Sequence, residues 1–265
     1  MTRIISIVNQ KGGVGKTTTS VNIATSLAAV GKKVLLIDLD PQGNASTGFG
    51  FSSAEREINS YHILTENASA ESAILETVVP KLSLIPATID LTGAEIELVT
   101  MEKREYKLTR AIQSLDGRFD YILIDCPPSL GLLTLNALTA SNAVLIPLQC
   151  EFYALEGLSH LLKTVELVKA GLNPKLDIHG VLLTMYDRRN KLTEHIESDV
   201  REYLGDTVYK TVIPRNVRVS EAPSHGVPAI VYDMRCPGSK AYLSLAREVI
   251  RREKQMAQIA NKEAA

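Results

Sequence analysis

Near its start the chain reads Asn9-Gln10-Lys11-Gly12-Gly13-Val14-Gly15-Lys16-Thr17-Thr18-Thr19. An apolar run at residues 4–8 precedes this glycine-rich stretch, and a helical pattern follows it to about residue 30. A strand, a glycine-rich loop and a helix, in that order, form the context that a phosphate-binding loop requires. The sequence therefore predicts that this loop binds a nucleoside triphosphate.

The residue types in the loop fit phosphate chemistry. Glycines allow backbone N–H groups to turn toward phosphate oxygens, and the N-terminus of the helix adds a partial positive charge. Lys16 is expected to reach the β- and γ-phosphates, and the Thr17 hydroxyl to bind Mg²⁺. The usual pattern fails at Gln10, where such loops have glycine, and a second lysine, Lys11, stands beside the glycine pair. The residues expected to contact the nucleotide here are Gly12, Gly13, Val14, Gly15, Lys16, Thr17 and Thr18.

The bulk composition narrows the class of protein. With 265 residues, of which 45% are hydrophobic, the chain is long enough to bury a substantial core, and we expect one domain over residues 1–265. The net charge of −1 gives no overall sign of a nucleic-acid or membrane partner. Three scattered cysteines suit neither a disulfide framework nor a zinc site and fit a reducing compartment. The first strand leaves no room for a signal peptide, and no apolar run approaches the ~18 residues of a membrane span, so we expect a cytoplasmic protein.

Short apolar runs alternate with helical patterns along the chain. This alternation predicts an α/β fold, a mostly parallel twisted sheet with helices on both faces. The predicted strands cover residues 4–8, 34–39, 82–85, 121–125, 143–147 and 178–184, with 208–212 and 229–231 as short additions. The predicted helices cover residues 16–30, 102–115, 132–138, 155–170, 192–203 and 240–258, and residues 257–265 are expected to fray.

Two strands of the predicted sheet end in carboxylates. In such folds the ligand lies beyond the carboxyl ends of the strands, so Asp38, Asp40 and Asp125 come under consideration. Asp40 is expected to position the water that attacks the γ-phosphate, although Asp also starts turns, which is the alternative reading. Asp125 ends the run 121–125 in the manner of a Walker B strand and is expected to hold Mg²⁺, directly or through water. Residues 127–131 after it are a candidate sensor of the γ-phosphate.

A proline-containing segment near the C-terminus is a weaker candidate for base recognition. Pro214 could pack against a planar base, and the Asn216 amide could hydrogen-bond to it. A simple connecting loop explains these residues equally well.

Basic residues gather in the last third of the chain. Residues 210–252 contain eight Lys or Arg and three Asp or Glu, a net charge of +5, and Arg188, Arg189 and Lys191 form a second cluster. Such patches can hold DNA phosphates without reading sequence. Composition alone favours an ordinary solvated surface, and without interleaved aromatic residues the clusters do not suit stacking on single-stranded bases.

Taken together, these motifs resemble those of the deviant Walker A ATPases, and more narrowly the ParA and Soj chromosome-partitioning ATPases. The resemblance rests on residues 11–18, with Lys11 as the signature lysine, and on residues 38–44, 125–131, 149–157 and 213–223. It extends from about Arg3 to Arg252. It implies a P-loop NTPase of the deviant Walker A type that hydrolyses ATP with Mg²⁺, weakly when alone.

The resemblance also implies a mechanism. ATP would join two subunits face to face, with Lys11 of each contacting the phosphates in the other's site, so that Gly12 must stay small. Lys11, Lys16 and Asp40 would be the catalytic residues. The ATP-bound homodimer would bind double-stranded DNA without sequence preference, through positions that match Arg189 and Arg218. Arg188, Arg215, Arg247 and Arg251 would widen this patch.

The partner implied by the resemblance is a centromere-binding protein of the ParB or Spo0J type. Its stimulation of hydrolysis would dissolve the dimer and release it from DNA. The chain would thus serve the segregation of a chromosome or plasmid and associate with the nucleoid, and no membrane is expected.

Three alternatives remain at this stage. A MinD-like membrane-associated ATPase shares the same nucleotide site, but residues 247–257 offer a weak apolar face for an interfacial helix. A redox ATPase resembling the nitrogenase iron protein needs two suitably placed thiolates, and Cys126 and Cys150 make no evident pair. A DNA-compacting protein with a vestigial ATP site does not explain the complete set Lys11, Lys16, Thr17, Asp40 and Asp125.

Overall fold

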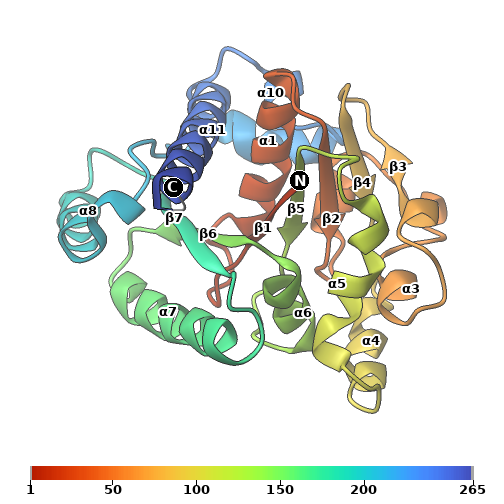
Figure 1. The fold of residues 1–265 in the computed structure, drawn as a ribbon. Coiled ribbons are helices and arrows are strands. Elements are labelled where there is room, and N and C mark those ends of the chain that lie inside the picture. Colours follow the sequence, from red (N-terminus) through yellow and green to blue (C-terminus); the bar gives the residue numbers. More distant parts are fainter. Residues whose placement is uncertain (1, 264–265) are drawn as a thin grey trace.

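The computed structural model describes residues 2–263, and for residues 257 and 259–263 it describes the backbone alone. Seven strands form one sheet in the order β3-β4-β2-β5-β1-β6-β7, drawn in Figure 1. Every neighbouring pair is parallel except β3 with β4. The predicted fold class is confirmed. The strands are β1 (Arg3–Ile7), β2 (Val34–Asp38), β3 (Leu75–Glu76), β4 (Leu82–Ile85), β5 (Tyr121–Asp125), β6 (Ala143–Gln149) and β7 (Asp177–Thr184).

Helices cover both faces of the sheet, and each face has its own apolar core. One face packs against α1 (Lys16–Ala29), α2 (Asn44–Gly48), α9 (Val217–Glu221), α10 (Ala229–Tyr232) and α11 (Pro237–Glu263). The other face packs against α3 (Ser60–Leu64), α4 (Leu91–Leu98), α5 (Lys107–Ala111), α6 (Leu132–Ala140), α7 (Ala154–Gly171) and α8 (Lys191–Leu204). With both faces covered, β2 and β5 are buried at every position, which explains why they read as continuous apolar runs.

Three of the predicted segments have a different structure, and five elements were not predicted, namely β3, α2, α3, α4 and α9. Residues 102–115 were expected to form one helix, but they form α5 between two 3₁₀ turns, Arg104–Tyr106 and Gln113–Leu115. Side chains of α6 bind the backbone here: Asn136 donates to the Arg104 carbonyl (2.8 Å), and Thr139 donates to the Glu105 carbonyl. These bonds occupy carbonyls that a continuous helix would use.

The two short additions are wrong as strands. Residues 229–231 belong to α10, because the Pro228 carbonyl accepts from the amides of Val231 and Tyr232 (both 3.0 Å) and starts a helical turn. Residues 208–212 make only an isolated bridge from Val208 to Val181. At the C-terminus α11 continues to Glu263, past the expected start of the frayed tail, and residues 264–265 lie outside the described residues.

Strand register brings the predicted site residues to one edge of the sheet. Ile7 of β1 and Asp38 of β2 both pair with Asp125 of β5. The loops that follow these three strands therefore leave the sheet side by side. The phosphate-binding loop, the segment after Asp38 and residues 127–131 meet at this edge.

Candidate nucleotide site

The loop between β1 and α1 has the backbone of a phosphate cradle. Gly13 and Gly15 have φ of +75° and +85°, a left-handed conformation that glycine adopts without strain. Neighbouring strands hold the loop in place: the Thr184 hydroxyl donates to the Val14 carbonyl (2.8 Å), and the Asn9 amide donates to the Pro147 carbonyl (2.7 Å). The loop is therefore fixed before any ligand binds.

A cavity of about 350 Å³ opens directly above this loop. It brings together the three segments identified in the sequence, which are the phosphate loop, residues 38–44 and residues 127–131, and adds Met185 after β7. Its lining consists of Gly12, Gly13, Gly15, Lys16, Thr17, Thr18, Asp40, Gln42, Asn44, Pro128 and Met185. Of the predicted loop residues, Val14 is buried outside this lining and contributes its carbonyl to the loop's support.

Lys16 is a nearly buried cation at the edge of the cavity, and its ammonium donates to the Lys11 carbonyl (3.0 Å). Burial lowers the pKa of Lys16, and the nearby carboxylates of Asp125 and Asp40 oppose this shift. An ammonium between two carboxylates and an open cavity is well placed to bind a further anion. Phosphate oxygens are the anions that such a loop accommodates.

Asp125 lies completely buried beneath the start of α1. Its Oδ1 accepts from the Ser20 hydroxyl (2.7 Å), whereas Oδ2 has no hydrogen-bond partner within residues 2–263. Burial raises the pKa of this carboxyl, Asp38 beside it raises it further, and the hydroxyls of Ser20 and Thr17 oppose the rise. A buried oxygen without a partner is costly in free energy, and a cation would supply the missing contact. Thr17 and Asp125 thus fit the expected Mg²⁺ site.

The two carboxylates after β2 have different surroundings. Asp38 is buried and accepts from the Ser46 amide (2.8 Å) and hydroxyl (2.7 Å), which ties α2 to the end of β2. Burial raises the pKa of Asp38 despite these bonds. Asp40 instead lines the cavity, and its Oδ1 accepts from the Gln42 amide (3.0 Å). Asp40 is therefore the one of the two that can meet a ligand.

The signature lysine points away from its own phosphate loop. Lys11 forms a salt bridge with Glu151, at the start of the turn before α7. Next to Glu151, Phe152 and Tyr153 are 78% and 67% exposed and make an edge-to-face pair with ring centroids 5.1 Å apart. A cation, an anion and two exposed rings thus lie together at the rim of the site.

Pro214 and Asn216 do not line the phosphate cavity. Pro214 lies in a separate groove of about 520 Å³ with Arg188, Arg189 and Lys240. The Asn216 side chain caps α9 by accepting from the Val219 amide (3.3 Å). Base recognition by Pro214 and Asn216 stays a prediction.

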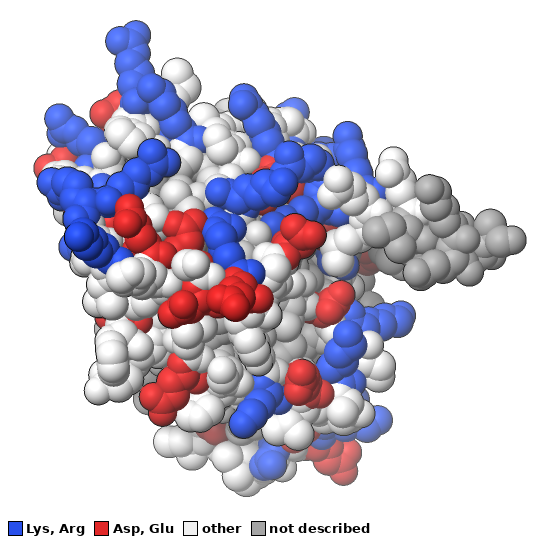
Figure 2. Space-filling model, turned by 90° about the vertical axis from the view of Figure 1, so that its left-hand side faces the viewer, with Lys and Arg blue, Asp and Glu red and all other residues white. Residues whose placement is uncertain are grey.

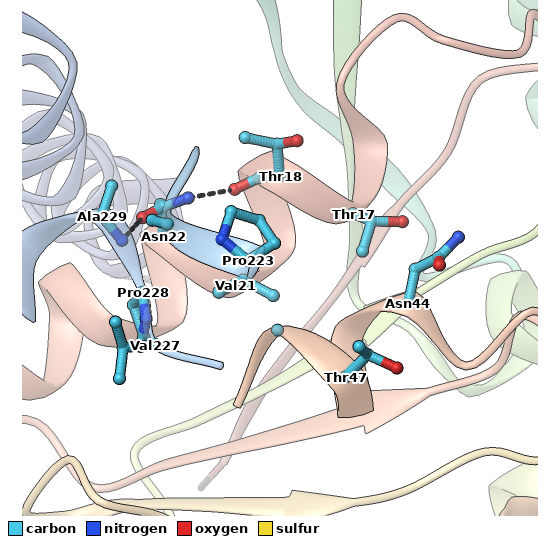
Figure 3. Close-up of a pocket in the computed structure, with 12 residues that line it drawn as sticks. Thr17, Thr18, Val21, Asn22, Asn44, Thr47, Pro223, Val227, Pro228 and Ala229 are labelled. Carbon is cyan, nitrogen blue, oxygen red and sulfur yellow. Dashed lines mark hydrogen bonds between the residues drawn. The ribbon is translucent and has the colours of Figure 1, made fainter. Parts of the chain in front are cut away.

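A second cavity, of about 280 Å³, adjoins the phosphate cavity and shares Thr17, Thr18 and Asn44 with it (Figure 3). It lies between α1, α2 and the segment from Ala222 to Ala229, and its inner wall is mostly apolar. Asn22 closes it by donating to the Thr18 carbonyl (2.8 Å) and accepting from the Ala229 amide (2.9 Å).

Sequence reasoning missed several residues of the site. Met185 directly follows β7, so the strand-end rule applied to Asp40 would have found it, and its φ of +49° marks a strained position. Ser20 lies one helical turn after Lys16 and faces Asp125, which its spacing could have indicated. Asn44 and Gln42 carried no motif that separates them from ordinary loop residues.

The predicted DNA-binding arginines are all exposed, and Figure 2 shows Lys and Arg gathered on the upper part of one face. Arg188 and Arg189 share the groove with Lys240, although they lie about 50 residues before it in the chain. Arg189 and Arg218, the two main candidates for DNA binding, each pair with a carboxylate of the same chain. Asp187 accepts two bonds from Arg189 (3.0 and 2.9 Å), and Glu221 accepts one from Arg218 (3.0 Å). The patch is thus partly neutralised.

Comparisons of sequence find close relatives over nearly the whole chain. A family model described as AAA domain matches residues 2–178. The chain is 56% identical to the chromosome partitioning protein ParA of Caulobacter vibrioides over 254 residues, 95% of each chain. It is 59% identical to the sporulation initiation inhibitor protein Soj of Bacillus subtilis over 249 residues, 94% of this chain and 98% of that one.

Solved structures share the fold. Cobyrinic acid a,c-diamide synthase from Mycobacterium smegmatis, with a bound ATP analogue and magnesium, is 38% identical with a TM-score of 0.85, and 96% of each chain is covered. The septum site-determining protein MinD from Pyrococcus horikoshii, complexed with Mg-ADP, is 30% identical with a TM-score of 0.78, covering 94% of this chain and 96% of that one.

Proposed function

Because the chain belongs to the ParA and Soj family of chromosome-partitioning ATPases, we propose that it is an ATP-driven switch that binds DNA as a dimer and releases it on hydrolysis. The family resemblance inferred from the motifs is confirmed by the identities. The observation that carries the proposal is the cavity in which Lys16, Thr17 and Asp40 converge above a fixed phosphate loop.

The proposed ligand is ATP with Mg²⁺. Structural neighbours hold an ATP analogue or ADP with magnesium, which supports the same pair here. Thr17 and Asp125 would hold the cation, which would neutralise charge on the phosphates. Lys16 binds the β- and γ-phosphates, and Asp40 orients the attacking water and accepts its proton. Water and ATP give ADP and phosphate.

The rim of the site supports a symmetric dimer. A two-fold interface places the same patch on both sides, so the patch must complement itself. Lys11 and Glu151 carry opposite charges, and Phe152 and Tyr153, next to Glu151 in the chain, supply exposed apolar surface. In the dimer Lys11 would leave Glu151 and contact the partner's phosphates, where its charge stabilises the transition state.

The exposed arginines of the last third of the chain support DNA binding in the dimer. Arg189 and Arg218 would exchange their carboxylate partners for DNA phosphates, with Arg188, Arg215, Arg247 and Arg251 around them. Joining two such faces raises avidity steeply, so that losing the dimer loses the DNA. A centromere-binding partner of the ParB type would trigger that loss by stimulating hydrolysis.

A MinD-like membrane role is the less supported alternative. The MinD structure is 30% identical, against 56% and 59% for the partitioning proteins. That alternative also needs an interfacial helix, for which residues 247–257 offer only a weak apolar face.

The experiment that tests the proposal measures binding to a random-sequence DNA duplex with ATP, with ADP and without nucleotide, at two salt concentrations. Binding that needs ATP and weakens strongly with salt is expected. Binding that is equal in all nucleotide states would contradict the switch. Absence of DNA binding, together with ATP-dependent sedimentation with anionic vesicles, would favour the MinD-like alternative.

A further inference from the structure

Arg56 is a buried cation outside the nucleotide cavity, in the segment between α2 and α3. It is 8% exposed, and its guanidinium donates to four groups, three within residues 43–51 and one at Ala87. Nη1 donates to the carbonyls of Gly43 (3.2 Å) and Ala87 (3.1 Å), and Nη2 donates to the Thr47 hydroxyl (2.9 Å) and the Phe51 carbonyl (2.6 Å). The planar fork of arginine suits such a set of fixed acceptors.

The contact with Gly43 is unusually close. Gly43 has φ of +60°, and a Cβ there would lie 2.5 Å from Arg56 Nη1 and 2.9 Å from the Ala87 carbonyl oxygen. Only glycine leaves room for the guanidinium at this position. Gly43 and Arg56 thus join the start of α2 closely to the segment that carries Arg56.

Gly43 in turn closes the turn that carries Asp40. The Gly43 amide donates to the Asp40 carbonyl (2.9 Å), and within the same turn the Gln42 amide donates to Asp40 Oδ1 (3.0 Å). The direction of the Asp40 carboxylate therefore depends on the geometry of residues 40–43. The far end of that turn is held by Arg56.

We propose that Arg56 is a positioning residue for ATP hydrolysis, which holds the Gly43 carbonyl so that the turn presents Asp40 to the attacking water. This inference rests on the proposed function of Asp40. Arg56 does not line the phosphate cavity, and its guanidinium bonds the Gly43 carbonyl, so it acts through Gly43. Its loss leaves the phosphate cradle intact and disturbs the water-orienting side chain.

The test compares kcat with nucleotide affinity in the full chain. Arg56→Met keeps an unbranched apolar stem and removes the guanidinium with its four hydrogen bonds. We expect single-turnover ATP hydrolysis to slow on the order of 10- to 100-fold, because small misplacements of a catalytic group have effects of this size. The Kd for a non-hydrolysable ATP analogue stays near the wild-type value. Arg56→Lys restores part of the rate, because an ammonium can still donate to Gly43.

A matched control separates positioning from stability. Asn59 donates to the Arg56 carbonyl (2.8 Å) and caps α3, so Asn59→Ala destabilises the same segment and leaves the guanidinium contacts in place. We expect Asn59→Ala to lower the melting temperature and to keep the hydrolysis rate. If Arg56→Met and Asn59→Ala both lower the hydrolysis rate in proportion to the fall in melting temperature, Arg56 has only a structural role and the inference is overturned.

Two further variants keep the outcome decisive. If Arg56→Met does not fold, Gly43→Ala disturbs the same contact from the other side and should also lower kcat more than affinity. Asp40→Ala separates this inference from the proposed function. Normal hydrolysis by Asp40→Ala removes the assigned role of Asp40, whereas an inactive Asp40→Ala with a normal Arg56→Met overturns the inference about Arg56 alone.

Discussion

Lys11 pairs with Glu151 of its own chain, across 140 positions of sequence. The two side chains are 45% and 46% exposed, and their contact holds the lysine at the rim of the site, away from the phosphate cavity of its own subunit. A lysine that acts in a second subunit must first give up this partner. In the proposed dimer, this salt bridge would therefore compete with dimerisation.

Glu151→Gln is expected to release Lys11 and to favour the ATP-dependent dimer modestly. An exposed ion pair is worth at most about 1 kcal/mol, and each of the two subunits would give up one, so the dimerisation constant should rise no more than about 30-fold. Analytical ultracentrifugation with a non-hydrolysable ATP analogue measures this constant. A weaker dimer would instead mean that Glu151 pairs with a residue of the second subunit.

Asp40→Ala should trap the ATP-bound state. Removing the group that orients water and accepts its proton is expected to slow hydrolysis on the order of 10²-fold or more. Because Asp40 lies outside the phosphate loop, nucleotide binding and ATP-dependent DNA binding should remain. Phosphate release measures the hydrolysis rate, and retention of the protein on a DNA-coated sensor surface measures DNA binding. Rapid hydrolysis by Asp40→Ala would show that Asp40 does not have this role.

Gly12→Val should block the close dimer and spare the monomer. A Cβ at Gly12 meets no atom within 4 Å, and the residue is not in the left-handed region, so valine fits the isolated subunit. Nucleotide binding by the monomer should be normal, while crosslinking across the interface with ATP should disappear. Gly13→Val is the contrasting control, since its φ of +75° strains the loop itself. A normal dimer of Gly12→Val would show that the loop is not at the interface.

Substitutions that change the charge around Arg189 and Arg218 should change DNA affinity. Loss of positive charge should lower it, and loss of a neighbouring negative charge should raise it. Arg189→Glu with Arg218→Glu should abolish ATP-dependent DNA binding without affecting dimerisation, because both side chains are exposed and neither lines the phosphate cavity. Asp187→Asn removes the carboxylate that pairs with Arg189 and should strengthen binding. Each phosphate contact that is lost or gained changes the slope of log K against log salt by about 0.9. Unchanged affinity in the double variant would place the DNA surface elsewhere.

Glu248 should make stability depend on pH. It is buried on α11 and accepts from the amides of Lys210 (2.8 Å) and Thr211 (2.9 Å). Burial alone would raise the pKa of Glu248, but these hydrogen bonds outweigh it, and the pKa lies below its usual value. Because the unfolded-state pKa is about 4.3, the carboxylate stabilises the fold above that pH, and the contribution is lost as the pH falls through the lower folded-state value.

Glu248→Gln is therefore expected to lower the free energy of unfolding by about 1–3 kcal/mol at pH 7, the value of hydrogen bonds to a charged group. The difference from wild type should narrow as the pH falls below about 4. Urea unfolding at a series of pH values measures it, with the exposed Glu202→Gln as control. A difference that does not change with pH would mean that the charge of Glu248 is not what stabilises the fold.

Much of the fold follows from local sequence. The six parallel strands were predicted to within a few residues, because parallel strands buried on both faces must be continuously apolar, whereas the short antiparallel β3 was not predicted. Segments whose structure depends on distant groups were predicted wrongly. Residues 102–115 lack a continuous helix because side chains of α6, some 30 positions away, bind their carbonyls.

The same distinction applies to the site. The phosphate loop, Asp40 and Asp125 could be identified from sequence, because glycine spacing and strand ends depend on immediate neighbours in the chain. By contrast, only the tertiary structure brings Arg56 to Gly43 and Glu151 to Lys11. These contacts join residues on different segments, and their geometry is set by how helices and strands pack. No local pattern encodes that packing, so the residues that support the chemistry became visible only in the folded protein.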